Sequence, residues 1–300
     1  MSDAGTQAGK LTRRSARAFS VGAVLARVAR LRESRLAMIG LGLLSFWILV
    51  ALLAPLIAPF SPNATIQPMA KPGAISASGQ VFWLGTDHLG RDVLSRIIWG
   101  ARTVLIYAPI ATGTAFVVGM LMGLLAGYKA GWIDEILSRA GDLVLAFPAL
   151  VLYIVLIVKF GASGLNIVLA VTIASSPAIM RLTRSQVIDL RIRGYTYAAQ
   201  LRGESAWYVM LVEILPNARA PLIVDACLRL GYVTMTIGTL GFLGLGLPPP
   251  DADWGGMINE ARQFAMVFPH MVVFPCIAVS SLVLGFNLLA DGVREISRDE

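Results

Sequence analysis

Residues 36–59 read LAMIGLGLLSFWILVALLAPLIAP, and no side chain in this stretch is charged. A helix of about 20 apolar residues crosses the roughly 30 Å hydrocarbon core of a bilayer, so this stretch is long enough to do so. A cleaved signal peptide is the competing interpretation, with an apolar region of about 7–15 residues and a small-x-small cleavage site. The stretch is longer than that and runs into Ala58-Pro59-Phe60. We therefore expect an uncleaved first membrane helix.

The composition of the whole chain agrees with a membrane location. Of its 300 residues, 56% are hydrophobic and 14% are charged, and the mean hydropathy is +0.72. Soluble domains carry about 25% charged residues. The predicted fold class is all-α, a polytopic membrane protein with six transmembrane helices. The expected spans are 36–59, 101–128, 140–160, 164–183, 221–247 and 268–290.

The distribution of charge sets the expected topology. The net charge of +7 does not indicate nucleic-acid binding, because the basic residues form short runs beside apolar segments. Residues 1–35 are predicted to be a basic cytoplasmic segment, followed by a transmembrane domain over 36–300. Alternation places the 60–100 interval in the periplasm, and the 184–220 loop and both termini in the cytoplasm. The 184–220 loop holds five arginines, whereas 248–267 holds one arginine beside three acidic residues, as the positive-inside rule requires.

Three shorter features complete the expected organisation. Apolar residues at helical spacing in 91–100 predict a short amphipathic helix lying at the membrane interface. Residues 129–139 are expected to form a cytoplasmic loop. Gly119, Gly123 and Gly127 recur every four residues and predict a face on which two helices pack closely.

The long cytoplasmic loop is the most informative part of the sequence. Residues 195–217 read YTYAAQLRGESAWYVMLVEILPN, which predicts a helix, a turn at Gly203, a second helix and a stop at Pro216. Small side chains at Ala198 and Ala199 would leave one helix face low enough to dock on another protein. The alternative is a solvated loop with no partner, against which stand several apolar residues that need cover.

The sequence contains no site for nucleotide hydrolysis. The string closest to a Walker A motif, Gly9-Lys10-Leu11, lacks both the following hydroxyl residue and the earlier glycine. Cys227 and Cys276 fall inside expected spans and are interpreted as core residues. No catalytic, cofactor-binding or metal-binding residue is predicted for this chain.

Polar residues inside the spans leave alternatives open. Asp225 and Arg229 lie four residues apart on one helix face, where they can form an ion pair. The pair is either structural or lines a pathway. An ion-coupled secondary transporter would need carboxylates deep in the bundle, and Asp225 is its one candidate. Gly161-Ala162-Ser163-Gly164 together with His270 could form an intramembrane serine protease, although a tight turn explains the string more simply.

The 195–217 segment resembles the EAA loop of ABC importer permeases, whose pattern is Glu-Ala-Ala, a glycine four residues on, and then Ile-x-Leu-Pro. This sequence has tyrosine in place of the glutamate and lacks the residue between isoleucine and leucine. The expected ATPase-coupling residues are Tyr197, Ala198, Ala199, Gly203, Ile214, Leu215 and Pro216.

Three further stretches are similar to the dipeptide, oligopeptide and nickel permeases of that group. The resemblance covers about 36–296 and is closest to the second permease of each pair. The stretches are LGTDHLGRDVLSR (84–96), FLGLG with the following Pro-Pro and Trp-Gly (242–255), and FNLLADG (286–292).

The resemblance implies a complete machine of which this chain is one part. The implied fold is the ABC type I importer permease fold in the bacterial inner membrane, in contact with membrane lipid. The implied partners are a homologous second permease, two ATP-binding subunits that carry ATP and Mg, and a periplasmic substrate-binding protein. The implied function is translocation of di- or oligopeptides, or a similar small solute, by alternating access.

Overall fold

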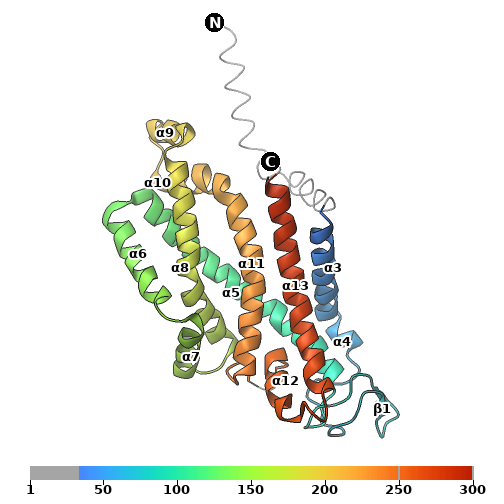
Figure 1. Ribbon diagram of the computed structural model, residues 1–300. Coiled ribbons are helices and arrows are strands. Elements are labelled where there is room, and N and C mark those ends of the chain that lie inside the picture. Colours follow the sequence, from blue (N-terminus) through green and yellow to red (C-terminus); the bar gives the residue numbers. More distant parts are fainter. Residues whose placement is uncertain (1–33, 249–250, 299–300) are drawn as a thin grey trace.

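A computed structural model describes residues 34–248 and 251–298, and it forms one helical bundle with a small cap at one end (Figure 1). Most of the predicted basic segment 1–35 and the second proline of the Pro-Pro motif lie outside the described residues. The helices are α3 (Arg35–Leu52), α4 (Ala54–Ile57), α5 (Val93–Lys129), α6 (Gly131–Leu145), α7 (Ala149–Phe160), α8 (Gly164–Arg191), α9 (Gly194–Leu201), α10 (Ala206–Tyr208), the π-helix η3 (Val209–Ile214), α11 (Leu215–Phe242), α12 (Trp254–Ala261), the 3-10 turn η4 (Arg262–Phe264) and α13 (His270–Arg298).

The all-α fold class is confirmed, and the span count is five or six. Five described helical stretches are long and apolar enough to cross a membrane: α3, α5, α8, α10 to α11, and α13. A sixth span exists if α6 and α7 are counted as one, because these two helices pass the same test together but are bent by 87°. The span predicted for 140–160 is therefore not one continuous helix. Pro148 cannot continue the α6 hydrogen-bonding pattern and disfavours a helical conformation at Phe147, so the helix ends there.

Two predicted elements next to α5 are also wrong. Residues 91–100 do not form a separate interfacial helix, because α5 begins at Val93 and runs without a break to Lys129. Asp92 caps its start by accepting a hydrogen bond from the Ser95 amide at 2.7 Å. The apolar stripe of this first turn is buried inside the protein rather than at the membrane surface. The predicted 129–139 loop is reduced to Ala130, after which α6 begins.

The 60–92 interval folds into a small cap at the end of the bundle. Its two-residue strands β1 (Ala74–Ile75) and β2 (Val81–Phe82) pair antiparallel and were not predicted from the sequence. Phe82 is fully buried and stacks on Phe60, with ring centroids 5.0 Å apart. The molecule therefore has two different ends, which we call the α12 end, with this cap, and the α9 end, opposite (Figure 1).

The glycine face predicted on α5 packs directly against α8. A Cβ atom added at Gly119, Gly123 or Gly127 would come within 2.5–2.7 Å of α8 atoms between Ser176 and Val187. Side chains are therefore excluded from this face, and the two backbones lie close together, as predicted.

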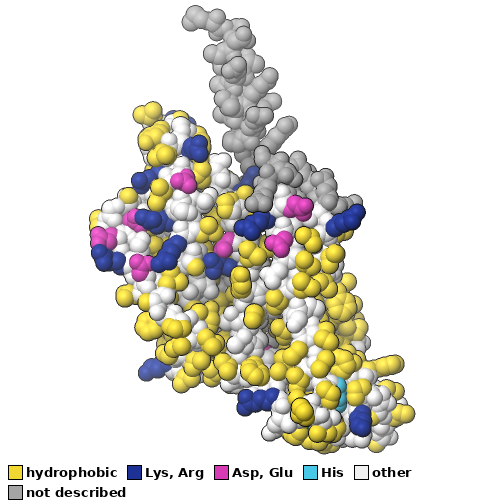
Figure 2. All heavy atoms as spheres, viewed as in Figure 1, with side chains coloured by type: hydrophobic (Ala, Val, Ile, Leu, Met, Phe, Trp, Pro, Cys, Tyr) yellow, Lys and Arg dark blue, Asp and Glu magenta, His cyan; other side chains and the backbone are white. Residues whose placement is uncertain are grey.

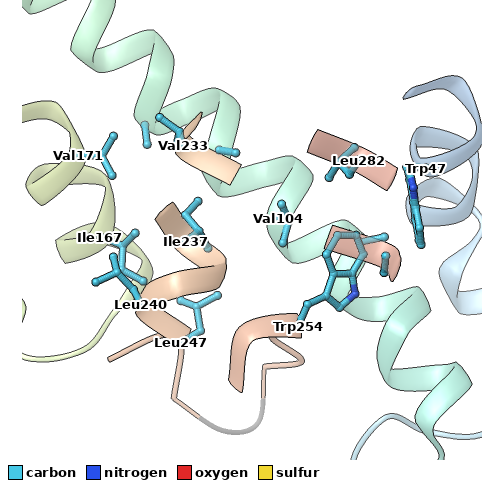
Figure 3. Packing of buried hydrophobic residues seen from close by; sticks show 14 of the residues in the cluster. Trp47, Val104, Ile167, Val171, Val233, Ile237, Leu240, Leu247, Trp254 and Leu282 are labelled. Carbon is cyan, nitrogen blue, oxygen red and sulfur yellow. The ribbon is translucent and has the colours of Figure 1, made fainter. Parts of the chain in front are cut away.

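Two tryptophans hold the core near the α12 end. Trp254 is fully buried, and its indole nitrogen donates to the Ile97 carbonyl at 2.9 Å. Trp47 of α3 meets it edge-on, with ring centroids 5.0 Å apart (Figure 3). A Cβ atom at Gly100 would approach Trp254 to 2.5 Å, so this position of α5 requires glycine. The short helix α12 is thereby fixed against α3 and α5.

Candidate functional site

The segment predicted to couple to an ATPase projects from the α9 end of the bundle (Figure 1). It is shorter than the predicted 184–220 loop, because α8 continues to Arg191 and the following helical run begins at Ala206. Between these two helices, α9 stands on its own, joined by Ile192, Arg193 and the turn 202–205.

The turn after α9 is a Schellman motif at the predicted glycine. Gly203 has a φ of +77°, its amide donates to the Gln200 carbonyl at 2.9 Å, and the Glu204 amide donates to the Ala199 carbonyl at 3.2 Å. These two bonds satisfy the last carbonyls of the helix, and the left-handed conformation favours glycine. Gly203 therefore fixes the direction in which the chain leaves α9.

The two alanines of the motif have different environments. Ala198 is exposed, but Ala199 is completely buried. Ala199 belongs to an apolar cluster at the base of α9, so the prediction that it forms part of a low docking face is wrong. Its small side chain instead allows α9 to approach the bundle closely. The other buried members of the cluster are Leu124, Val187, Val209, Met210 and Ile214.

Several apolar side chains around α9 remain uncovered. Leu201 is 89% exposed, and Tyr197 and Trp207 are each about half exposed, at 53% and 51%. Leu201 is the feature that the sequence analysis missed. Its signal was available, since it is an apolar residue directly before the glycine turn, on the α9 face opposite Ala199.

The predicted proline stop at Pro216 is wrong. The chain is helical from Ala206 to Phe242 and passes through both Pro216 and Pro221. Before Pro216 the helix widens into the π-helix η3, in which the Leu215 amide donates to the carbonyl of Met210, five residues back. The widened turn lets α11 start afresh with proline in its first turn, where a missing amide hydrogen costs little.

Polar contacts connect α9 to the bundle on several sides. The Thr196 hydroxyl donates to the Leu190 carbonyl at 2.9 Å, and the Gln200 amide group donates to the Tyr128 hydroxyl at 3.3 Å. Arg202 pairs with Glu213 of η3 at 3.2 Å. A displacement of α9 would therefore be transmitted to α5, α8 and α11 together.

The predicted pair Asp225 and Arg229 is formed in α11. The Arg229 Nε donates to an Asp225 carboxylate oxygen at 2.6 Å, and both side chains are about one-fifth exposed. Asp225 also lines a cavity of about 490 Å³ between α8, α11 and α13. Arg294 of α13 lies on the same cavity and forms no ion pair among the described residues. The other lining residues are Leu182, Ala220, Pro221, Val224 and Leu228.

The two residues of the hypothetical protease are not brought together. The Ser163 hydroxyl accepts from the Asn166 amide at 3.2 Å and caps α8, which makes it a helix-capping residue. His270 packs beside Gly85 in the cap at the α12 end. In this structure, the string around Ser163 acts as the tight turn that was the simpler explanation.

A network of buried charges lies at the α12 end. Arg91 donates to Asp87 at 2.6 Å and also to Glu260. Asp87, His88 and Glu260 lie close enough to hold a cation, but Arg91 already pairs with both carboxylates, and Arg96 lies 4.0 Å from Asp87, so two guanidinium charges offset the two carboxylate charges. The Asp253 carboxylate caps α12 by accepting hydrogen bonds from the amides of Gly255 and Gly256. Burial raises the pKa of Asp253 to about 6.

The apolar helices define a multi-pass membrane protein. Residues 119–298 match the family described as binding-protein-dependent transport system inner membrane component, and the chain belongs to this family of ABC importer permeases, which has the type I permease fold. Residues 26–72 match the N-terminal TM domain of oligopeptide transport permease C. This membership does not favour the ion-coupled transporter or the protease.

The similar proteins are named as transport system permease proteins, and each matches this chain over 71–86% of its own length. The dipeptide transport system permease protein DppC of Alkalihalophilus pseudofirmus is 39% identical over 89% of this chain and 86% of its own. The glutathione transport system permease protein GsiD of Pectobacterium atrosepticum is 40% identical over 71% of each chain. The di/tripeptide transport system permease protein DppC of Pseudomonas aeruginosa is 37% identical over 85% of this chain and 86% of its own.

Proposed function

We propose that this chain is the second permease of an ATP-driven importer that carries di- or oligopeptides, or a similar small solute, across the bacterial inner membrane. The names of its relatives support a peptide-sized cargo, since they refer to dipeptides, di/tripeptides and glutathione. Translocation follows alternating access, in which two packings of the same helices differ by a few kcal/mol.

The proposed assembly contains a homologous second permease, two ATP-binding subunits and a periplasmic substrate-binding protein. The absence of a Walker A motif from the sequence supports placing ATP and Mg on the separate subunits. In this arrangement the α9 end and both termini lie in the cytoplasm, and the α12 end lies in the periplasm. The excess of arginine near α9 supports that orientation.

The observation that carries the proposal is the exposed apolar tip of an otherwise anchored helix. Leu201 is 89% exposed at the end of α9, while Ala199 on the opposite face is buried in the cluster beneath it. A protruding apolar side chain on a rigidly held helix can anchor an interface by entering a pocket on a partner. We propose that Tyr197, Ala198 and Leu201 contact the ATPase. Ala199, Gly203, Ile214, Leu215 and Pro216 hold α9 in position.

The test separates contact residues from positioning residues. Leu201→Glu should abolish co-purification of the ATPase subunits and solute uptake, while the permease still inserts and melts at the wild-type temperature. Ala199→Glu should also abolish uptake, but it should loosen α9 as well, because it buries an unpaired charge. Ile75→Glu, an equally polar change on an exposed residue at the α12 end, is the control and should leave ATPase co-purification intact.

The proposal is wrong if Leu201→Glu retains both co-purification and uptake. Uptake is measured in a strain lacking its own peptide importers, with radiolabelled di- and tripeptides. A wild-type complex that hydrolyses ATP but imports none of them would contradict the proposed cargo and leave the coupling role standing.

We further propose that Asp225 and Arg229 line the solute pathway. Their support is the cavity between α8, α11 and α13, which Asp225 lines. Charged residues inside membrane spans are costly and are commonly functional. If Asp225→Asn combined with Arg229→Gln leaves uptake and solute range unchanged, the pair is structural.

A further inference from the structure

A second ion pair lies on the outer surface of the helices beside that cavity. Arg181 of α8 donates to Asp142 of α6 at 2.5 Å. Their side chains are 58% and 60% exposed, so the pair is open to whatever surrounds this face of the chain. In the view of Figure 2, acidic and basic side chains gather toward the α9 end, and the flank below them is mostly apolar.

The depth of this pair follows from helix geometry. Arg181 lies 17 residues after the start of α8 at Gly164, and Asp225 lies 17 residues before the end of α11 at Phe242. At 1.5 Å per residue, each lies about 26 Å from the α12 end of its helix. That distance is within the hydrocarbon thickness of roughly 30 Å. Measured along their own helices from the α12 end, the two ion pairs therefore lie at a similar distance, which is less than the full hydrocarbon thickness.

The break between α6 and α7 is an independent polar feature that excludes lipid as its cover. The two helices meet at 87°, and Ala146, Phe147 and Pro148 are all exposed. No side chain caps the start of α7, so the first amides of that helix have no partner within it. Non-helical backbone at membrane depth is tolerated where protein buries it or where it lines a water-filled cavity, but not against lipid.

The cavity lies next to the exposed ion pair. Leu182, the residue after Arg181, lines the 490 Å³ space that also contacts Asp225 and Arg294. A space of this size is in the range of small-molecule sites. The exposed pair on α6 and α8, the uncapped break and the charged cavity are thus three polar features on neighbouring helices.

We propose that the Asp142–Arg181 pair and the α6–α7 break face the water-filled solute path. Asp142 and Arg181 would then be a second pair of charged residues along this path, beside Asp225 and Arg229. The inference rests on the proposed transport function and adds two residues and a backbone segment to the site. A solute with separated positive and negative groups, such as a peptide with free termini, would meet both signs of charge at this level. Lipid and a tightly packed partner helix are the coverings that the proposal excludes.

The test is the water accessibility of single cysteines in the complete importer. Cys227→Ser and Cys276→Ser remove the native thiols, and Phe147→Cys and Asp142→Cys then introduce one thiol each. Phe147→Cys is the more informative variant, because it lies deeper and leaves the ion pair intact. Phe46→Cys, on the exposed face of α3, is the lipid-facing control. Inside-out vesicles are treated with a membrane-impermeant, charged thiosulfonate.

The expected result is that Phe147→Cys and Asp142→Cys react at least about tenfold faster than Phe46→Cys, because a thiol ionises and reacts in water but not in hydrocarbon. A transported dipeptide should slow both reactions. Reaction of Phe147→Cys as slow as that of the control would overturn the proposal. So would fast reaction in the isolated chain with none in the complete importer, since a partner would then cover the break.

The labelling does not depend on the cargo being a peptide. If fast labelling persists in a complex that imports no peptide, the water-lined path stands while the proposed cargo fails. If peptides are imported and Phe147→Cys stays unlabelled, the proposed function stands while this inference fails.

Discussion

The two ends of the bundle satisfy their side chains in different ways. At the α12 end, Trp254 is enclosed and hydrogen-bonded to Ile97, and Arg91 is matched by carboxylates of this same chain. At the α9 end, Leu201 is almost fully exposed, and the Asp142–Arg181 pair is open on its outer side. We call the α12 end complete because its central tryptophan and Arg91 are matched within this chain, although Ile75, Trp83 and Met266 on its surface are exposed. The other end, which we call incomplete, leaves the tip of α9 and an ion pair open. We infer from this difference a fixed α12 end and a lever at the α9 end.

The largest effect is expected at the complete end, on stability. Trp254→Ala removes a fully buried indole together with its hydrogen bond, which should cost about 3–5 kcal/mol. The apparent melting temperature in detergent, followed by circular dichroism, should fall by roughly 10 °C. Trp83→Ala removes an exposed indole in the cap at the same end and should change it little. Equal melting temperatures for the two variants would show that the α12 end is not the rigid one.

A second effect at the complete end depends on pH. The folded-state pKa of Asp253 is raised to about 6 by burial, so the folded protein binds a proton there more tightly than the unfolded chain does. The resulting stability is present below the usual pKa near 4 and is lost as pH rises through about 6. Asp253→Asn keeps the helix cap without the charge. Relative to wild type, this variant should therefore gain on the order of 2–3 kcal/mol between pH 4 and pH 7.

The measurement is the difference in melting temperature between Asp253→Asn and wild type, taken at several pH values. Most other titrating groups are shared by the two proteins, so their contributions largely cancel in the difference. A difference that does not change between pH 4 and pH 7 would mean that Asp253 titrates as an ordinary exposed carboxylate, and that the α12 end is more hydrated than its packing indicates.

The same contrast separates what the sequence could predict from what it could not. Hydropathy located the spans, and the loop motif located α9, because both signals are local. The inward orientation of Ala199 and the passage of the helix through Pro216 depend on contacts with α5 and α8, which no local pattern contains. The break at Pro148 was visible as a proline, but the apolar residues on both sides favoured one continuous span. Leu201 was not predicted as a contact residue, since its exposure is decided by the direction of α9.

The smallest expected effect is a local one at the incomplete end. Gly203→Ala introduces a side chain at a φ of +77°, where no neighbouring atom lies within 4 Å of the added Cβ, so the cost comes from the backbone alone. That cost is about 1–2 kcal/mol, which should raise the hydrogen-exchange rate of the Glu204 amide about 5- to 30-fold through local opening. Gly194→Ala is the matched control, because it lies at the start of α9, has equal space and does not need a positive φ.

If the two ends differ as proposed, Gly203→Ala loosens α9 and weakens ATPase binding while the melting temperature stays at the wild-type value. A fall in melting temperature as large as that of Trp254→Ala would instead mean that the turn supports the whole bundle, and α9 would then be a structural part of the core and not a lever attached to it.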